Sequence, residues 1–287
     1  MNKYVILTDS SSDLSASLMQ ELGVEAISLE VNMDGEEPKY NHEVVPSEFY
    51  AKLRTKVGAK TSAASMDAFT NFFEKHLKEG KDVIYLGFSS GLSVTYTNGK
   101  NAAEDLMEQY PDRKIVAIDT LCASLGQGLL VALAARKKAE GASFEEVVDF
   151  VESNKLHLCH WFTVDDLFFL KRGGRVSAAT AVVGTMLAIK PVMHVDNDGH
   201  LINVSKARGR KAAINALADK LSETGIEPDG QLIYICHGDC LEDAQYLADT
   251  VKAKYPNCEI MIDYTGPVIG AHSGPGTLAL FYLGTER

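Results

Sequence analysis

The chain has 287 residues, and its 39 Asp and Glu residues against 28 Lys and Arg residues give a formal net charge of −11 at pH 7. This charge repels phosphate backbones and anionic lipid headgroups, so it argues against nucleic-acid binding and against adsorption to membrane surfaces. Because single cores stop growing near ~250 to 300 residues, we expect two domains rather than one.

The N-terminal residues and the cysteines indicate an intracellular protein without metal. Residues 1–3 lead directly into an apolar strand, without the charged and then apolar pattern of a secretory leader, and no apolar run approaches the ~20 residues of a membrane span. We therefore expect a cytoplasmic location and no stable membrane insertion. The five cysteines include no Cys-x-x-Cys pair, so we interpret them as buried thiols.

The first half of the chain alternates short apolar strands with helices. Gly23 is placed to end one helix, Pro46 to open another, and Ser143 with Glu146 forms a capping box. The expected strands are 4–7, 26–31, 83–88 and 115–118, and the expected helices are 14–22, 46–53, 66–77, 101–109, 125–139 and 143–154. Continuous apolar strands are typical of a parallel sheet that helices cover on both faces.

The second half shows a more mixed α/β pattern. Residues 156–164 alternate between apolar and polar side chains, and residues 194–204 predict a hairpin around 196–199. Further strands are expected at 232–235 and 259–264, with a helix between them. We therefore expect a boundary near residue 155, with domains at 1–155 and 156–287.

The first polar segment that could bind a ligand is 60–65. Ser65 has the place of an N-cap before the following helix, and this role explains it fully. Thr61 and Ser62 lie upstream, where a helix N-terminus offers N–H groups and a positive dipole end to an anion. Anion binding by this segment and a purely structural role both stay open.

A second polar segment follows the strand at 83–88. The carboxyl ends of strands are where open α/β sheets place ligands, and Gly91 lets the backbone approach closely. Ser89, Ser90 and Ser93 supply the hydroxyls. The alternative is a turn held by its own serine-to-backbone hydrogen bonds. A serine hydrolase is excluded, because no Gly-x-Ser-x-Gly elbow is present and no Asp–His pair can be assigned to Ser93.

A third segment, 266–276, surrounds His272 with glycines and prolines. We expect a rigid turn that presents the imidazole as a hydrogen-bond donor. Together, the three segments suggest a site where neutral donors meet one small anionic group.

The sequence contains no complete nucleotide-binding motif. Gly126-x-Gly128 lacks the third glycine of a dinucleotide motif, so packing of a helix against a sheet is its favoured role. No Gly-x-x-x-x-Gly-Lys-Ser/Thr motif is present.

Two basic clusters stand out in this acidic chain. Arg172 and Arg175 flank a Gly-Gly pair, and Arg208 lies near Lys206, Arg210 and Lys211. Arginine beside a glycine turn suits docking to a phosphate or an acidic partner. The alternative is a solvated helix end whose cations complement the helix dipole.

Taken in order, the motifs of the chain resemble those of the DegV family over essentially the whole length. They are Thr8-Asp9-Ser10, Thr61-Ser62 with Ser65, Ser89-Ser90-Gly91-Leu92-Ser93, Asp119-Thr120 with Gly126-x-Gly128, Arg172-Gly173-Gly174-Arg175, Lys190-Pro191 and His272-x-Gly274-Pro275-Gly276. The resemblance implies a two-domain fold: a three-layer α/β/α N-terminal domain with a parallel sheet, and a two-layer α/β C-terminal domain with a mixed sheet.

The resemblance also implies that a long-chain fatty acid lies buried between the two domains. Thr61, Ser62, Ser93 and His272 would then bind the carboxylate without a fixed counter-charge, and Ser65, Ser89, Ser90 and Gly91 are secondary candidates for the ligand site. The depth of the acyl pocket is expected to depend on Phe168, Phe169, Met186, Leu187 and the strand 278–283. No catalytic residue, metal or cofactor is expected.

By this resemblance, the protein is the non-catalytic binding subunit of a bacterial fatty acid kinase. It would present the acid to a separate ATP-binding subunit, which forms an acyl phosphate for phospholipid synthesis, and Arg172, Arg175 and Arg208 would dock that partner. Two alternatives are a phosphotransferase resembling the substrate domain of dihydroxyacetone kinase, and a structural or regulatory module whose lipid completes the core.

Overall fold

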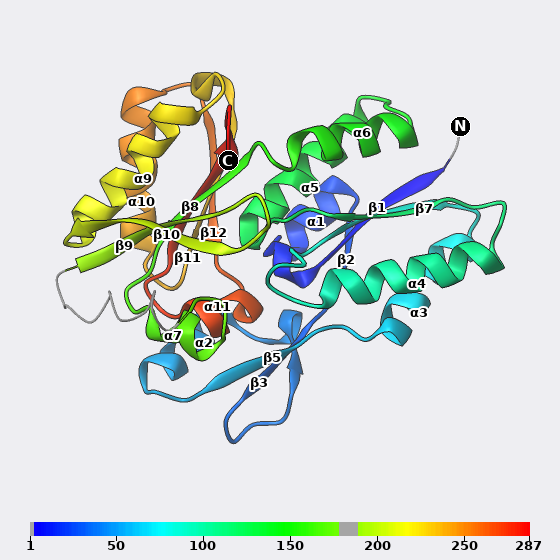
Figure 1. Ribbon diagram of the computed structural model, residues 1–287, viewed down its shortest axis with the longest axis horizontal. Helices are drawn as coiled ribbons and strands as arrows, with labels where there is room; N and C mark the ends of the chain where they lie inside the picture. The colour runs from blue at the N-terminus through cyan, green and yellow to red at the C-terminus, as the bar shows by residue number, and fades with distance from the viewer. Residues whose placement is uncertain (1–2, 178–188) are drawn as a thin grey trace.

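A computed structural model describes residues 3–177 and 189–287 (Figure 1). Met186 and Leu187, which the sequence places near the acyl chain, lie outside the described residues. Among the helices that are described, none combines the length and the apolar character needed to cross a bilayer.

The N-terminal half forms three layers around a four-stranded sheet in which every strand pair is parallel. The strands are β2 (Glu25–Ile27), β1 (Tyr4–Asp9), β6 (Asp82–Gly87) and β7 (Ile115–Asp119), in that order across the sheet. Helices α3 (Met66–Lys78) and α4 (Thr95–Gln109) cover one face, and α1 (Ala16–Leu22), α5 (Ser124–Ala139) and α6 (Phe144–Asn154) cover the other. This arrangement confirms the parallel sheet that the continuous apolar strands predicted.

A small antiparallel sheet accompanies these layers. It consists of β4 (Lys39–Tyr40), β3 (Glu30–Met33) and β5 (Ala59–Ser62), next to α2 (Pro46–Arg54). The single strand expected at 26–31 is therefore wrong, because β2 joins the large sheet and β3 the small one. The two strands separate where the Leu29 N–H donates to Ser10 Oγ at 2.9 Å, a side-chain contact instead of a ladder hydrogen bond.

The C-terminal half contains a mixed six-stranded sheet. Its order is β10 (Leu201–Arg208), β9 (Ile189–Val195), β8 (Leu158–Thr163), β13 (Leu278–Leu283), β11 (Leu232–His237) and β12 (Glu259–Tyr264). Helices α9 (Arg210–Thr224) and α10 (Leu241–Lys254) pack on one face through a separate apolar cluster. The hairpin predicted around 196–199 is confirmed as β9 and β10, although both strands are longer than the pattern showed.

Helix α5 lies between the two large sheets (Figure 1). One apolar cluster runs from the N-terminal sheet through α5 to β8, β11 and β13, so buried side chains connect the two halves. A Cβ on Gly126 would overlap His160 Nε2, and one on Gly128 would lie 2.6 Å from the Ser12 carbonyl oxygen. The expected role in helix–sheet packing is therefore confirmed for Gly126, whereas Gly128 packs against Ser12 and Leu14, outside the strands.

Two further expectations about local structure are wrong. Helix α4 begins at Thr95, six positions before the predicted start, because Ser93 Oγ accepts from the Thr95 N–H at 3.2 Å and so holds the turn that opens the helix. The segment expected as a turn around His272 is the helix α11 (Pro267–Ser273), which follows Gly266 and ends at Gly274 with φ +80°. Proline at the first helical position and glycine just past the last explain both ends.

Candidate functional site

A cavity of about 480 Å³ opens between the N-terminal loops and the six-stranded sheet. Its volume lies in the range of small-molecule sites. Most of the wall is apolar, and the apolar lining residues are Leu29, Ala63, Phe88, Leu92, Val94, Ala123, Phe162, Leu170, Val195, Leu201, Val268, Ile269, Ala279 and Phe281. The expected contribution of strand 278–283 thus comes from two residues of β13, whereas Phe168 is exposed.

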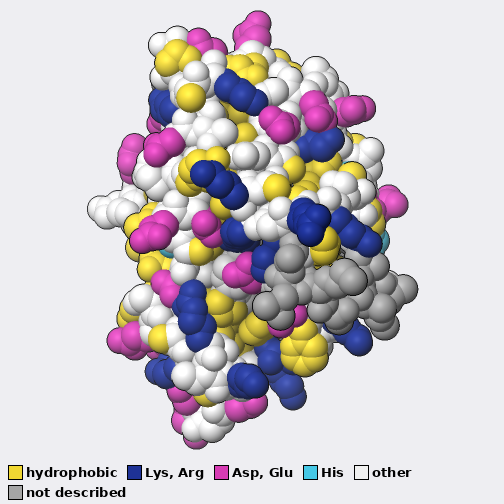
Figure 2. All heavy atoms as spheres, turned by 90° about the vertical axis from the view of Figure 1, so that its left-hand side faces the viewer, with side chains coloured by type: hydrophobic (Ala, Val, Ile, Leu, Met, Phe, Trp, Pro, Cys, Tyr) yellow, Lys and Arg dark blue, Asp and Glu magenta, His cyan; other side chains and the backbone are white. Residues whose placement is uncertain are grey.

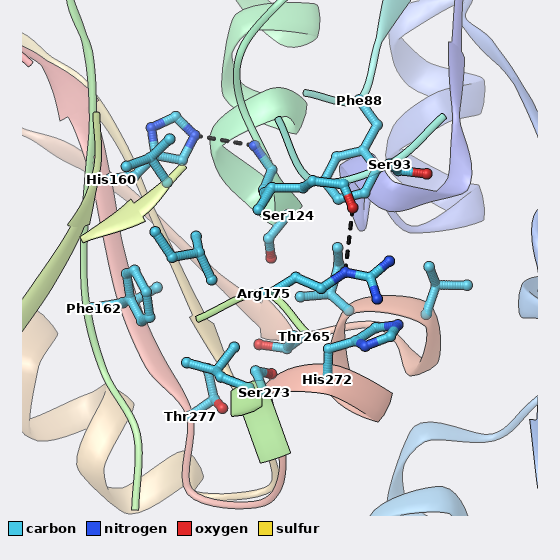
Figure 3. A pocket seen from close by; sticks show the side chains of 18 of the residues that line it. Phe88, Ser93, Ser124, His160, Phe162, Arg175, Thr265, His272, Ser273 and Thr277 are labelled. Carbon is cyan, nitrogen blue, oxygen red and sulfur yellow. Dashed lines mark hydrogen bonds between the residues drawn. The ribbon is translucent and has the colours of Figure 1, made fainter. Parts of the chain in front are cut away.

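Polar side chains from three distant segments line the cavity, and Figure 3 labels two of them, Ser93 and His272. Thr61 Oγ1 of β5 lies 2.8 Å from His272 Nε2 of α11, a contact between residues 211 positions apart. Ser93 comes from the turn before α4, and its Oγ lies 2.8 Å from Thr95 Oγ1. All three side chains line the cavity and are partly buried. They bring hydroxyl and imidazole groups, which can donate or accept hydrogen bonds, to the cavity wall.

The imidazole of His272 is neutral at pH 7. Burial, and after it the nearby charges of Arg175 and Arg172, together lower its pKa to about 4. The ring fits because residue 173 is glycine, since a Cβ there would overlap His272 Nδ1. His272 therefore supplies a hydrogen bond in the cavity wall and no positive charge.

Arg175 does supply a positive charge there. Its side chain is half-buried and lines the cavity, with Nε donating to the Leu92 carbonyl at 3.2 Å and the guanidinium donating to the Gly173 carbonyl. Burial lowers the pKa of this arginine, but a guanidinium keeps its charge at neutral pH. The sequence placed Arg175 only in the docking set, so the site differs from the expected arrangement of neutral donors without a counter-charge.

Ser62 lies on the opposite side of β5 from Thr61. Its Oγ accepts from Asn32 Nδ2 at 3.1 Å, and the residues that line the cavity include Thr61 and Ala63 on either side of it. Successive side chains of a strand point to opposite faces, so two adjacent hydroxyls cannot both face the same cavity. Of the four residues expected at the carboxylate, Thr61 and His272 are in contact, Ser93 lines the same cavity, and Ser62 does not line it.

Comparisons with known proteins identify the family of the chain. A family model described as an uncharacterised protein of the DegV family matches residues 3–285. A DegV domain-containing protein of Clostridium perfringens is 46% identical over 100% of this chain and 99% of its own. The chain belongs to the DegV family.

Two solved structures from this family resemble the protein closely. A DegV lipid binding protein from Thermotoga maritima is 30% identical, with 99% of each chain covered and a TM-score of 0.85. A DegV family protein from Thermus thermophilus, a structure that describes fatty acid binding, is 30% identical over 98% of this chain and 99% of its own, with a TM-score of 0.87. Relatives that share this fold therefore bind fatty acids.

The secondary candidates of this DegV-family protein have mainly structural contacts. Ser65 Oγ accepts from the Ala68 N–H at 3.2 Å, which confirms its role as the N-cap of α3. The fully buried Ser89 donates to the Gly199 carbonyl at 2.9 Å, and a Cβ on Gly91 would lie 2.7 Å from the Asp198 carbonyl oxygen. Of these four candidates, only Ser90 is among the residues that line the cavity.

The other two arginines of the docking set are exposed. The Arg172 guanidinium lies over the Phe169 ring, 5.0 Å from its centre, and Arg208 ends β10. Arg210 Nε, by contrast, donates to Asp243 at 2.8 Å. On the face shown in Figure 2, Lys and Arg side chains are interspersed with Asp and Glu.

Sequence reasoning missed a second group of polar residues in the cavity wall: Ser124, Cys236, Thr265 and Ser273. Ser273 lies in the predicted segment 266–276 but was not selected there. The local sequence of the other three gave no signal, because each follows or belongs to an ordinary strand or helix. Nor did the sequence indicate His160, whose Nδ1 donates to the Leu158 carbonyl at 2.9 Å while Nε2 accepts from the Ala123 N–H at 3.2 Å. Burial lowers the pKa of His160 well below its usual value, so the ring is a neutral part of the wall.

Nothing in the described ranges, 3–177 and 189–287, resembles a metal centre, since no three His, Cys, Asp or Glu side chains gather there. The site is thus built from hydroxyls, imidazole and one guanidinium around an apolar space. Such a space accommodates an apolar chain, and the polar end can hold a single anionic group.

Proposed function

We propose that the protein binds a long-chain fatty acid, with the tail in the cavity and the carboxylate at Thr61, Ser93 and His272. The observation that carries this proposal is an apolar cavity with hydrogen-bonding side chains from three segments at one end. A buried carboxylate needs such donors, because without them it takes up a proton. The fatty acids bound by relatives of the same fold support the assignment.

The tail supplies most of the affinity in this proposal. Burying about sixteen carbons at ~0.8 kcal/mol per CH₂ gives on the order of 10 kcal/mol, as an upper value. The carboxylate site then mainly sets the position of the head group. Arg175 adds a charge beside it, which holds the carboxylate ionised.

The finer part of the proposal is that a separate kinase subunit phosphorylates the bound acid. A carboxylate oxygen would attack the γ-phosphorus of ATP, and the bond from this phosphorus to the β-phosphate oxygen would break. The products would be ADP and an acyl phosphate, which phospholipid synthesis would use. Arg172, Arg175 and Arg208 would dock this partner, because Arg175 lines the carboxylate end and Arg172 lies exposed nearby. Because the proposed co-substrate is ATP, we propose a cytoplasmic location for the reaction.

Denaturing mass spectrometry of the purified protein tests the binding step. We expect release of about one equivalent of fatty acid, and its absence, together with failure to bind added octadecanoic acid, would overturn the proposal. The kinase step is tested by acyl-phosphate formation with ATP, with and without the partner subunit. Product without the partner would favour a self-contained phosphotransferase instead.

Arg172→Ala tests the docking role. We expect this variant to retain its lipid and to lose turnover with the kinase subunit, because Arg172 is exposed and lies outside the cavity lining. If lipid content fell instead, the arginine would belong to the pocket.

A further inference from the structure

A second group of polar side chains lies in the cavity wall, beyond Thr61, Ser93 and His272. Its hydroxyls belong to Ser124, Thr265 and Ser273, whose side chains are 5%, 0% and 5% exposed. In Figure 3 they lie between His272 on one side and Phe162 on the other. An unsubstituted acyl chain that passes this wall presents only CH₂ groups to it.

Two of these hydroxyls meet at one sulfur atom. Thr265 Oγ1 donates to Cys236 Sγ at 3.0 Å, and Ser124 Oγ lies 3.3 Å from the same sulfur. The hydrogen of Thr265 is therefore already used inside the wall. Its oxygen keeps lone pairs that can accept a hydrogen bond.

Ser124 forms a hydrogen bond with the buried carboxyl of Asp13. The two oxygens are 2.5 Å apart, and burial raises the pKa of Asp13 to about 8. When the carboxyl is protonated it can donate to Ser124, and when it is ionised it accepts from Ser124. Ser124 can thus offer either a hydrogen or a lone pair. Both residues hold left-handed backbones, with φ +55°, which for residues other than glycine is uncommon and marks a fixed geometry.

Ser273 carries the observation that points to a ligand. Its Oγ is buried, and among the described residues it has no hydrogen-bond partner. Most buried polar groups in folded proteins do have a partner, and those without one call for an explanation. The neighbouring Thr277, which also lines the cavity, already donates its Oγ1 hydrogen to the Gly274 carbonyl at 2.8 Å, so this hydrogen is not free for a ligand.

We propose that Ser124, Thr265 and Ser273 form a second polar subsite, which binds a hydroxyl group carried on the acyl chain. The ligand would be a hydroxylated long-chain fatty acid, whose O–H donates to Thr265 while its oxygen accepts from Ser273. This inference rests on the proposed binding of a fatty acid. A water molecule offers the same O–H chemistry, so the test must separate a ligand hydroxyl from water.

The test compares octadecanoic acid with monohydroxylated octadecanoic acids whose hydroxyl is placed at successive carbons from the carboxylate to the methyl end. Dissociation constants are measured by calorimetry with delipidated wild-type protein and with Thr265→Val/Ser273→Ala. We expect at least one mid-chain isomer to bind the wild type as tightly as octadecanoic acid. The double variant should bind that isomer about tenfold more weakly than octadecanoic acid, equivalent to about 1.4 kcal/mol.

Ser273→Ala alone provides a second variant that is expected to fold, because its Oγ has no partner in the described structure. Ser93→Ala is the matched control, since it should weaken both ligands by the same factor. The inference is overturned if wild type and variants disfavour every hydroxylated isomer equally, the result expected when the wall holds only water. If octadecanoic acid itself does not bind, the proposed function fails, and this outcome is distinct from the previous one.

Discussion

The carboxylate end and the hydroxyl wall of the cavity are both polar, but they are built differently. At the carboxylate end, Thr61, Ser93 and His272 are partly buried, and they meet only because three separate segments converge. In the wall, Ser124 and Thr265 are fully buried and bond to Asp13 and Cys236. Substitutions at the first region should therefore change ligand chemistry, whereas substitutions around the second should change stability first.

The largest effect is expected at the carboxylate end. His272→Ala or Ser93→Ala should reduce acyl-phosphate formation with the kinase subunit by about tenfold to a hundredfold, because a hydrogen bond to a charged group contributes about 1.5–3 kcal/mol. Lipid content, measured by denaturing mass spectrometry, should change little, since the tail supplies the affinity. Unchanged product formation by variants that bind lipid normally would show that these donors do not orient the carboxylate.

A glycine beneath the hydroxyl wall should control stability. Gly126→Ala places a Cβ against His160 Nε2 and near Phe281, two side chains that also line the cavity. Overpacking of this kind costs about 1–3 kcal/mol, which urea denaturation would measure as a lower free energy of unfolding. Gly230→Ala is the matched control, because a Cβ there meets nothing within 4 Å. Equal stability of the two variants would contradict the close packing of α5 against β8 and β13.

The pH dependence of stability should reveal the buried Asp13. Its pKa is raised from 3.8 to about 8, so the folded protein keeps a proton that the unfolded chain releases at much lower pH. Asp13 therefore stabilises the fold most below the pKa that it has in the unfolded chain. This contribution is lost as the pH rises towards about 8, and the free energy of unfolding falls by on the order of 1 kcal/mol per pH unit.

Asp13→Asn removes this titration while keeping a residue that tolerates the left-handed backbone at φ +55°. Relative to the wild type, the variant should gain stability as the pH rises from about 5 to about 8, as measured by urea denaturation at each pH. The exposed Asp112→Asn should follow the wild type throughout. Parallel curves for Asp13→Asn and the wild type would mean that Asp13 is ionised in the folded state.

The elements that the sequence predicted well are those that local patterns determine. Capping by Ser143 and Glu146, the proline that opens α2 and the apolar run of β6 all depend on neighbours within a few residues. The prediction of one strand at 26–31 was wrong because Ser10, from an earlier turn, accepts a hydrogen bond from the Leu29 N–H, and the strand is interrupted there. Helix α11 was not predicted because Gly266, Gly270 and Gly274 in and around it are more typical of turns than of a helix.

The same distinction applies to the site. Thr61, Ser93 and His272 could be selected because hydroxyls and a histidine among glycines are unusual in their local sequence. Ser124 and Thr265 could not, and Ser273 was not distinguished from its neighbours in segment 266–276, because their role depends on how α5 and α11 meet the six-stranded sheet. Arg175 was assigned to docking for a similar reason, since only the fold shows that its side chain reaches the cavity.

The smallest expected effect separates two adjacent residues of β5. Thr61→Val removes the hydroxyl that contacts His272, and ligand binding should weaken by about 0.5–1.5 kcal/mol. Ser62→Ala should leave the dissociation constant of octadecanoic acid within about twofold of the wild type, because Ser62 Oγ bonds to Asn32 on the other side of the strand.

The pairing of β5 with β3 makes this comparison decisive. Val31 lies opposite Thr61 and Glu30 opposite Ser62, and a slip of one residue would exchange the two hydroxyls between the faces of the strand. An equal loss of binding in both variants would therefore mean that Ser62 also contacts the carboxylate. A loss in Thr61→Val alone would show that the alternation of β5 selects which hydroxyl the ligand meets.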